Sequence, residues 1–209
     1  MPITPAQALL ELEHQTNTFL SKYAVRIFGD PSGSHVASYR IEDGAPSERP
    51  GSILRTKNMH TTQSFQVRAR AAAAGNNPAG SVWFTAHSVK MFHSDNISAI
   101  GTYTLPVAGG PNLMVTGQLS GCSFAIHDVG DGSLVVAHIQ PGTHLAARPL
   151  QHALQAIPDW TIVYGRDDYS HDRVATIVGA RVGGRWHIWV QKQDRTTGDY
   201  QIRKVEQLI

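Results

Sequence analysis

The residues best suited to chemistry in this chain are a single cysteine and a histidine that follows it. Cys122 closes the run Leu119-Ser120-Gly121-Cys122 and precedes His138 by sixteen positions. It is the only cysteine among 209 residues, so an intrachain disulfide is excluded. A lone thiol with a histidine on a neighbouring segment is the minimal equipment for nucleophilic attack by a thiolate. The structural alternative is a buried cysteine that packs as a small hydrophobic residue.

The backbone beside the cysteine suits the binding of a developing negative charge. Gly121 permits a tight turn and lets a substrate approach the main chain closely. An exposed backbone N–H at or next to the nucleophile could then stabilise a tetrahedral oxyanion. We therefore expect Ser120, Gly121 and Ser123 to lie beside the bound substrate.

His138 is the predicted base because it lies on the strand that should pair with the cysteine segment. Residues 123–127 and 134–139 are typical of a β-hairpin around the Gly130-Asp131-Gly132 turn. Counted from that turn, Cys122 and His138 lie at comparable distances, and cross-strand neighbours have Cβ atoms about 5 Å apart. An imidazole at that position would lower the pKa of the thiol from about 8.5 towards neutrality.

The other ten histidines are weaker candidates. His127 is nearer to Cys122 in sequence, but five residues along one strand place it on the opposite face. The remaining nine contain no ligand-like pair on a helix, and with one cysteine we expect no metal site. Glycine-rich nucleotide-binding patterns are absent, so nucleotide binding is not indicated.

Charge and hydropathy exclude several classes of partner. The net charge is +2, and the eighteen Lys and Arg residues are scattered, which argues against nucleic acid. No apolar run reaches about 18 residues, so we expect no membrane span. The N-terminal sequence has neither a basic segment nor an apolar one, so we expect no secretory signal peptide.

The hydrophobic periodicity predicts one α/β domain, residues 1–209, with a large antiparallel or mixed sheet. The charged fraction of 16% and the 19 glycines fit a sheet-rich fold. Thr4-Pro5 should open a helix whose apolar stripe continues to Tyr23, and Pro149 should kink or split a helix over 143–157. Strands 23–28 and 35–41 should pair as a hairpin. Further strands are expected at 63–73, from 82, and at 113–115, 123–127, 134–139, 161–164, 174–180, 186–191 and 200–205, with a tight turn at Gly183-Gly184.

The segment from Val115 to Cys122, with His138 downstream, resembles the catalytic motif of bacterial glutamine-deamidase toxins. These include Burkholderia lethal factor 1 and the catalytic domain of the cytotoxic necrotizing factors, which carry Leu-Ser-Gly-Cys followed by a base histidine. Thr116, six residues before Cys122, matches a third active-site member of the lethal factor. A second segment, Tyr164-Gly165-Arg166-Asp167, is similar to a tetrapeptide of that protein, and the chain lengths are close.

This resemblance implies a fold, a reaction and a setting. The fold would be a sandwich of mixed or antiparallel β-sheets flanked by helices. Cys122 would attack a glutamine side chain of a host protein, His138 would protonate the ammonia, and Thr116 would orient the imidazole. The reaction would need no metal or organic cofactor. The target would be a translation-initiation helicase or a Rho-family GTPase. The protein would be a monomer, made in the bacterial cytoplasm and exported to act in the host cytosol.

Two other functions use the same residues. A thiol protease or a transglutaminase-like acyltransferase would share the nucleophile and the base, and differ only in acyl donor and acceptor. A non-enzymatic binding domain would keep Cys122 as inert packing. For Tyr164 to Asp167 the structural alternative is a turn at a strand end, held by an Arg–Asp pair.

Overall fold

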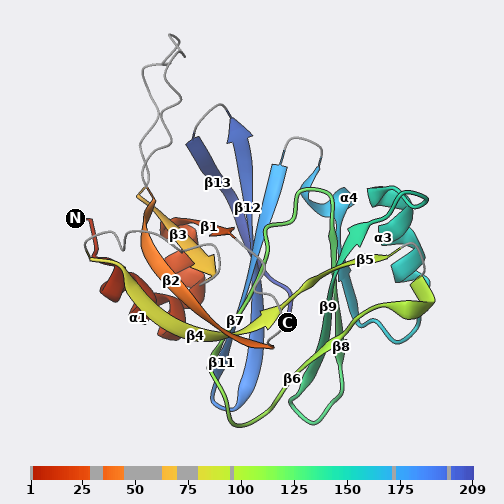
Figure 1. Ribbon diagram of the computed structural model, residues 1–209, viewed down its shortest axis with the longest axis horizontal. Helices are drawn as coiled ribbons and strands as arrows, with labels where there is room; N and C mark the ends of the chain where they lie inside the picture. The colour runs from red at the N-terminus through yellow and green to blue at the C-terminus, as the bar shows by residue number, and fades with distance from the viewer. Residues whose placement is uncertain are drawn as a thin grey trace.

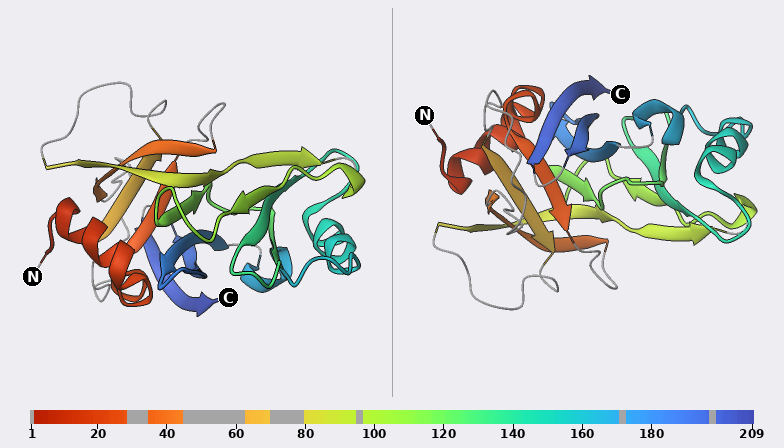
Figure 2. Two further views of the ribbon diagram at one scale, coloured as in Figure 1. Left: turned by 90° about the horizontal axis from the view of Figure 1, so that it is seen from below. Right: turned by 90° about the horizontal axis from the view of Figure 1, so that it is seen from above.

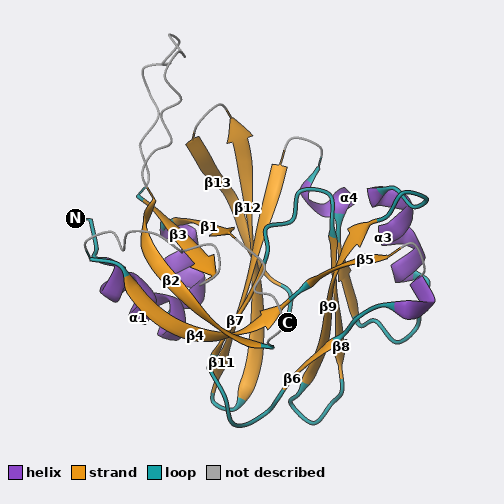
Figure 3. Cartoon of the chain, viewed as in Figure 1, coloured by secondary structure: helices purple, strands orange, loops and turns teal. Residues whose placement is uncertain are grey.

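The computed structural model describes residues 2–28, 35–44, 63–69, 80–94, 97–170, 173–196 and 199–209. Its elements form layers in the order helices, large sheet, small sheet, helix (Figure 1). Figure 2 shows the same order from two further directions, with the N-terminal helices at one end and α3 at the other. Mixed strand pairing in two sheets flanked by helices confirms the predicted fold class (Figure 3). None of the described helices combines the length and apolar character needed to cross a bilayer.

The N-terminal helix begins where the sequence predicts and ends earlier. Thr4 caps α1 (Pro5–His14), with its side chain accepting a hydrogen bond from the Gln7 backbone N–H. The helix then breaks at Gln15, whose φ of −138° is not helical, and α2 (Thr16–Lys22) continues the apolar stripe. The stripe therefore belongs to two helices, both packed on the large sheet.

The large sheet has the strand order β1-β3-β2-β4-β7-β11-β12-β13. The predicted hairpin of 23–28 with 35–41 is wrong, because β3 lies between these two strands and pairs with β1 in parallel. Residues 29–34, which would have formed the turn of that hairpin, lie outside the described residues. The strands are β1 (Ala24–Phe28), β2 (Val36–Gly44), β3 (Ser64–Ala69), β4 (Val82–Val89), β7 (Leu113–Thr116), β11 (Arg173–Val182), β12 (Arg185–Thr196) and β13 (Asp199–Gln207).

The C-terminal strands were predicted closely. β11, β12 and β13 contain the expected segments and form consecutive antiparallel pairs. Gly183 and Gly184 join β11 to β12 with φ values of +59° and +78°, the conformation that such a tight hairpin turn needs. The described part of the predicted strand over 63–73 forms β3 from Ser64 to Ala69, and 70–73 lie outside the described residues.

The small sheet has the order β10-β8-β9-β5, and β6 pairs with β9 outside that path. The predicted hairpin of β8 with β9 is confirmed, with Ser123 opposite Ile139 and Asp128 opposite Leu134. Its strands are β5 (Met91–Ser94), β6 (Tyr103–Leu105), β8 (Ser123–Asp128), β9 (Leu134–Pro141) and β10 (Ile162–Tyr164), and the turn η2 (Ile97–Ala99) follows β5.

Two helices accompany the small sheet. α3 (Ala147–Gln155) covers its outer face through Leu150 and Leu154. Pro149 does not split α3, because it lies in the first turn, where its missing N–H would have had no partner within the helix. A short helix that the sequence did not predict, α4 (Arg166–Tyr169), follows β10.

Alternation along single strands sends neighbouring side chains into different cores. Leu113 and Val115 of β7 face α1 and α2, whereas Met114 faces the small sheet. The core between the two sheets also holds Cys122, Phe124 and Tyr169, so the cysteine belongs to the central layer of the molecule.

Candidate active site

The cysteine motif forms the crossing from one sheet to the other. β7 ends in the large sheet at Thr116, and β8 begins in the small sheet at Ser123. Leu119 fastens this crossing to β11, because its N–H donates to the Ala175 carbonyl at 2.8 Å and its carbonyl accepts from the Ala175 N–H at 3.0 Å. The motif is therefore anchored by backbone hydrogen bonds at Leu119, three residues before the cysteine.

Burial changes quickly along the motif. Ser120 is exposed, Gly121 is half-buried and Cys122 is only 5% exposed. Gly121 does not have the positive φ that would demand glycine. A Cβ built on it would meet no atom within 4 Å, so the space in front of its Cα is open. This is the route by which a substrate could approach the backbone beside Cys122.

Thr116 and His138 are brought together by a chain of hydrogen bonds. The Thr116 hydroxyl donates to the Val89 carbonyl at 2.7 Å, and its Oγ1 lies 2.6 Å from His138 Nδ1. A hydroxyl has one proton, and a carbonyl can only accept, so Oγ1 must accept from Nδ1–H. The chain of contacts thus selects the tautomer of neutral His138 that leaves Nε2 without a proton.

His138 Nε2 is the free basic atom of the site. His138 is fully buried, and within the described residues Nε2 has no hydrogen-bond partner. Burial lowers the pKa of His138 from 6.5 to about 3. Gly117 is half-buried beside the ring, and a Cβ on it would lie 3.8 Å from His138 Cε1. At neutral pH the imidazole is therefore an uncharged base.

The thiol is not an activated thiolate in this arrangement. Burial raises the pKa of Cys122 to about 11, and a contact with the backbone of Ser120 offsets only part of that rise. The sequence predicted a pKa near neutrality, and this prediction is wrong. It assumed a solvated cysteine beside a positively charged imidazole, whereas both groups are buried and uncharged.

The hairpin register corrects the expected position of Cys122. His138 is directly opposite Phe124, so Cys122, two residues earlier on the same side, is diagonal to it. Diagonal neighbours lie about 7–8 Å apart, with their Cβ atoms somewhat closer, which is within reach of long side chains. Sγ of Cys122 and Nε2 of His138 are not hydrogen-bonded in this arrangement. Catalytic hydrogen bonds often tighten only when substrate binds.

The other predicted residues occupy different surroundings. His127 is on the opposite side of β8 from Cys122, as predicted, because its neighbours Ala125 and Ala137 belong to the core under α3. Ser123 is fully buried, and its Oγ lies 2.7 Å from where a Cβ on Gly165 would be. Its side chain is thus directed away from the cysteine layer, and only its backbone remains near the predicted oxyanion position.

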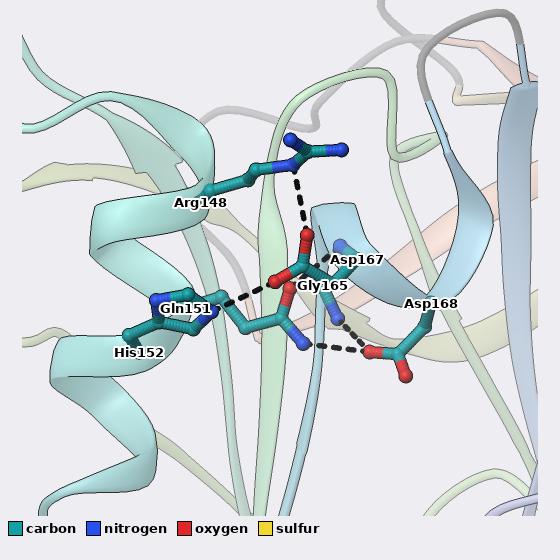
Figure 4. Close-up of polar contacts among 6 residues, drawn as sticks. All are labelled: Arg148, Gln151, His152, Gly165, Asp167 and Asp168. Carbon is teal, nitrogen blue, oxygen red and sulfur yellow. Dashed lines mark hydrogen bonds and ion pairs between the residues drawn. The ribbon is translucent and has the colours of Figure 1, made fainter.

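The segment from Tyr164 to Asp167 ends β10 and begins α4. Asp167 accepts from Arg148 Nε and His152 Nε2, both at 2.8 Å and both on α3 (Figure 4). The aspartate of the expected Arg–Asp turn therefore pairs with another helix. Arg166 instead lies over the ring of Tyr169, 5.4 Å from its centre.

Tyr169 and Val89 are site residues that sequence reasoning missed. The Tyr169 hydroxyl donates to the Cys122 carbonyl at 2.8 Å, across 47 residues of sequence. Neither residue belongs to a motif, and each reaches the site through tertiary packing. Within the described residues, no group of three or more His, Cys, Asp or Glu side chains is placed to hold a metal ion.

Comparison with known proteins shows a distant structural likeness and no match in sequence. No protein-family model and no curated protein sequence matches the chain. A solved structure that it resembles is the C-terminal domain of CNFy from Yersinia pseudotuberculosis, with 10% identity and a TM-score of 0.48. The similarity covers 98% of this chain and 99% of that one. A likeness this distant does not carry a function.

Proposed function

We propose that this protein is a cysteine-dependent deamidase that converts a glutamine of a protein substrate to glutamate. The observation that carries the proposal is the chain Val89 carbonyl, Thr116 hydroxyl, His138 Nδ1–H, which leaves Nε2 as an oriented base. The lone thiol of Cys122 lies in the same layer between the sheets. A nucleophile, a base and a group that orients the base are the parts that such catalysis requires.

In the first half-reaction, Cys122 Sγ bonds to the carboxamide carbon while its proton passes to His138 Nε2. Because thiol and imidazole are both uncharged, this transfer accompanies the attack and does not precede it. The tetrahedral oxyanion then collapses. The C–N bond breaks, and Nε2 returns the proton to the departing ammonia, leaving a thioester.

In the second half-reaction, water attacks the thioester carbon and gives a proton to Nε2. The C–S bond breaks, the thiolate recovers the proton, and the glutamate product leaves. The backbone N–H of Cys122 is the proposed donor to both oxyanions, because the space in front of Gly121 is open, whereas the Gly121 N–H itself is in contact with the Tyr169 hydroxyl. The sequence of steps needs only thiol, imidazole, water and backbone.

The substrate class follows from the resemblance of the motif. We propose a host protein as the target, with a translation-initiation helicase and a Rho-family GTPase as the first candidates, and action in the host cytosol after export. Incubation with eukaryotic lysate, followed by mass spectrometry for Gln-to-Glu conversion, tests this directly. Conversion should occur with the wild-type protein and vanish with Cys122→Ser and with His138→Ala.

The same experiment separates the alternative functions. Backbone cleavage would indicate a thiol protease, and incorporation of an added primary amine would indicate an acyltransferase. The deep burial and raised pKa of Cys122 are what an inert packing cysteine would also show. Equal behaviour of wild type and Cys122→Ser in every assay would establish that inert role and refute the proposed enzyme.

A further inference from the structure

Tyr169 makes a direct link between α4 and the cysteine. It is fully buried, and its hydroxyl donates to the Cys122 carbonyl at 2.8 Å. Burial is the main cause that raises the pKa of Tyr169, so the phenol keeps its proton and remains a donor. The carbonyl of the candidate nucleophile is therefore held by a side chain from a separate element.

The helix that carries Tyr169, α4, is held in place by hydrogen bonds at its start. The buried amide of Gln151 on α3 accepts from the Asp167 N–H and donates to Asp168 Oδ2, both at 2.8 Å (Figure 4). Asp168 Oδ2 also accepts from the Gly165 N–H at 2.8 Å, which closes the turn into α4. These bonds fix the start of a helix only four residues long and hence the position of its last residue, Tyr169.

We propose that Tyr169 is a positioning residue that holds the Cys122 backbone so that the thiol is directed at His138. The proposal rests on the deamidase function. Fixing the carbonyl of Cys122 restricts the ψ rotation of that residue, and with it the position of the Cα and Cβ from which Sγ projects. Within the second sequence motif, Gly165 and Asp167 would then act by seating α4, through their hydrogen bonds to Asp168 and Gln151, without contacting the substrate.

Tyr164 supplies a matched control for this hydrogen bond. It is stacked on Tyr169 with ring centres 6.0 Å apart, and both rings lie in the core between the sheets. The Tyr164 hydroxyl is buried and, within the described residues, has no hydrogen-bond partner. Removing that hydroxyl changes the same stack without touching Cys122.

The experiment compares Tyr169→Phe with Tyr164→Phe, with thermal unfolding as the check on folding. Two quantities are measured: the rate of Cys122 alkylation by iodoacetamide from pH 7 to pH 10.5, and the rate of Gln-to-Glu conversion in lysate. Tyr169→Phe should raise the alkylation rate and shift its pH profile to lower pH, because a freed turn exposes the sulfur. The same variant should slow conversion about fivefold to tenfold. Tyr164→Phe should match wild type in both.

The outcomes distinguish this proposal from the deamidase function. Unchanged alkylation and conversion in Tyr169→Phe, or equal changes in Tyr164→Phe, would overturn the positioning role. If wild type shows no conversion beyond Cys122→Ser while Tyr169→Phe still changes alkylation, the function fails and the control of the thiol stands. Should Tyr169→Phe not fold, Asp167→Ala, which loosens α4 through its half-exposed ion pairs, should change alkylation in the same direction.

Discussion

At the scale of single residues, two buried and uncharged groups replace the ion pair that an exposed cysteine and histidine would form. The hydrogen-bond chain through Thr116 orients the base, and burial sets the protonation of both groups. A neutral pair can react only when proton transfer accompanies attack. The pH dependence of the thiol therefore distinguishes the two forms of the site.

We predict that alkylation of Cys122 by iodoacetamide is slow at neutral pH and rises steadily towards pH 11. The pKa of the thiol is raised to about 11, so the thiolate fraction grows about tenfold per pH unit below that value. Quantifying the labelled protein by mass spectrometry over this pH range gives the profile. A rate that reaches its plateau near pH 7 would show a preformed thiolate and contradict the structure.

We predict that Thr116→Val slows Gln-to-Glu conversion roughly 10- to 100-fold, whereas Thr116→Ser retains most of it. Valine has a similar shape but cannot accept from Nδ1–H, so the ring loses its orientation and its selected tautomer. Serine keeps the hydroxyl. Conversion rates of the three proteins in lysate measure this, and equal rates for valine and serine variants would exclude an orienting role.

At the scale of elements, the site depends on how α4 passes the edge of the small sheet. β10 is the edge strand, and the chain turns at Gly165 so that Tyr169 enters the core between the sheets. The turn has no room for a side chain, because a Cβ on Gly165 would lie 2.7 Å from the amide of Gln151 and 2.7 Å from Ser123 Oγ.

We predict that Gly165→Ala lowers the free energy of unfolding by about 1–3 kcal/mol, since the added methyl overpacks a buried turn. Gly121→Ala is the matched control, because its Cβ would meet open space, and its effect should stay within about 0.5 kcal/mol. Urea denaturation measures both. Equal destabilisation by both variants would refute the account of the turn at Gly165. Gly121→Ala should nevertheless slow Gln-to-Glu conversion, because the methyl occupies the route to the backbone N–H beside Cys122.

At the scale of the whole molecule, the central layer keeps an ionisable group where water does not reach. His138 is fully buried between two sheets. Its pKa in the folded protein, about 3, lies below the ordinary value of 6.5, so the unfolded chain binds a proton more readily. At neutral pH the imidazole is uncharged and can stay buried. Because the unfolded chain binds the proton more readily, acid lowers the stability of the folded protein.

We predict that acid unfolds the protein partly through His138. The contribution of neutral His138 to the free energy of unfolding is fully present well above pH 6.5 and is lost as the pH falls from 6.5 to about 3. The slope from this group is at most about 1.4 kcal/mol per pH unit. Urea unfolding of wild type and His138→Leu at pH 7, 6, 5 and 4 isolates that slope. Parallel losses in the two proteins would mean that His138 is not buried as a neutral group.

The sequence alone determined the features that depend on local periodicity and residue type. Alternation predicted β8 and β9 and their hairpin, and parity placed His127 away from Cys122. Thr4 and Pro5 indicated the first helix, and two adjacent glycines indicated the turn before β12. Each of these features depends on backbone geometry over a few neighbouring residues, so the local sequence is enough to predict it.

The tertiary structure decided the features that need segments far apart in the chain. β3 enters between β1 and β2, which no local pattern forbids or requires. Tyr169 reaches Cys122 across 47 residues, and Val89 reaches Thr116 across 27. The protonation of Cys122 and His138 depends on burial, and burial is produced only when two sheets close over them. Local residue patterns carry neither the order of strands nor the exclusion of water, because both arise from packing the whole chain.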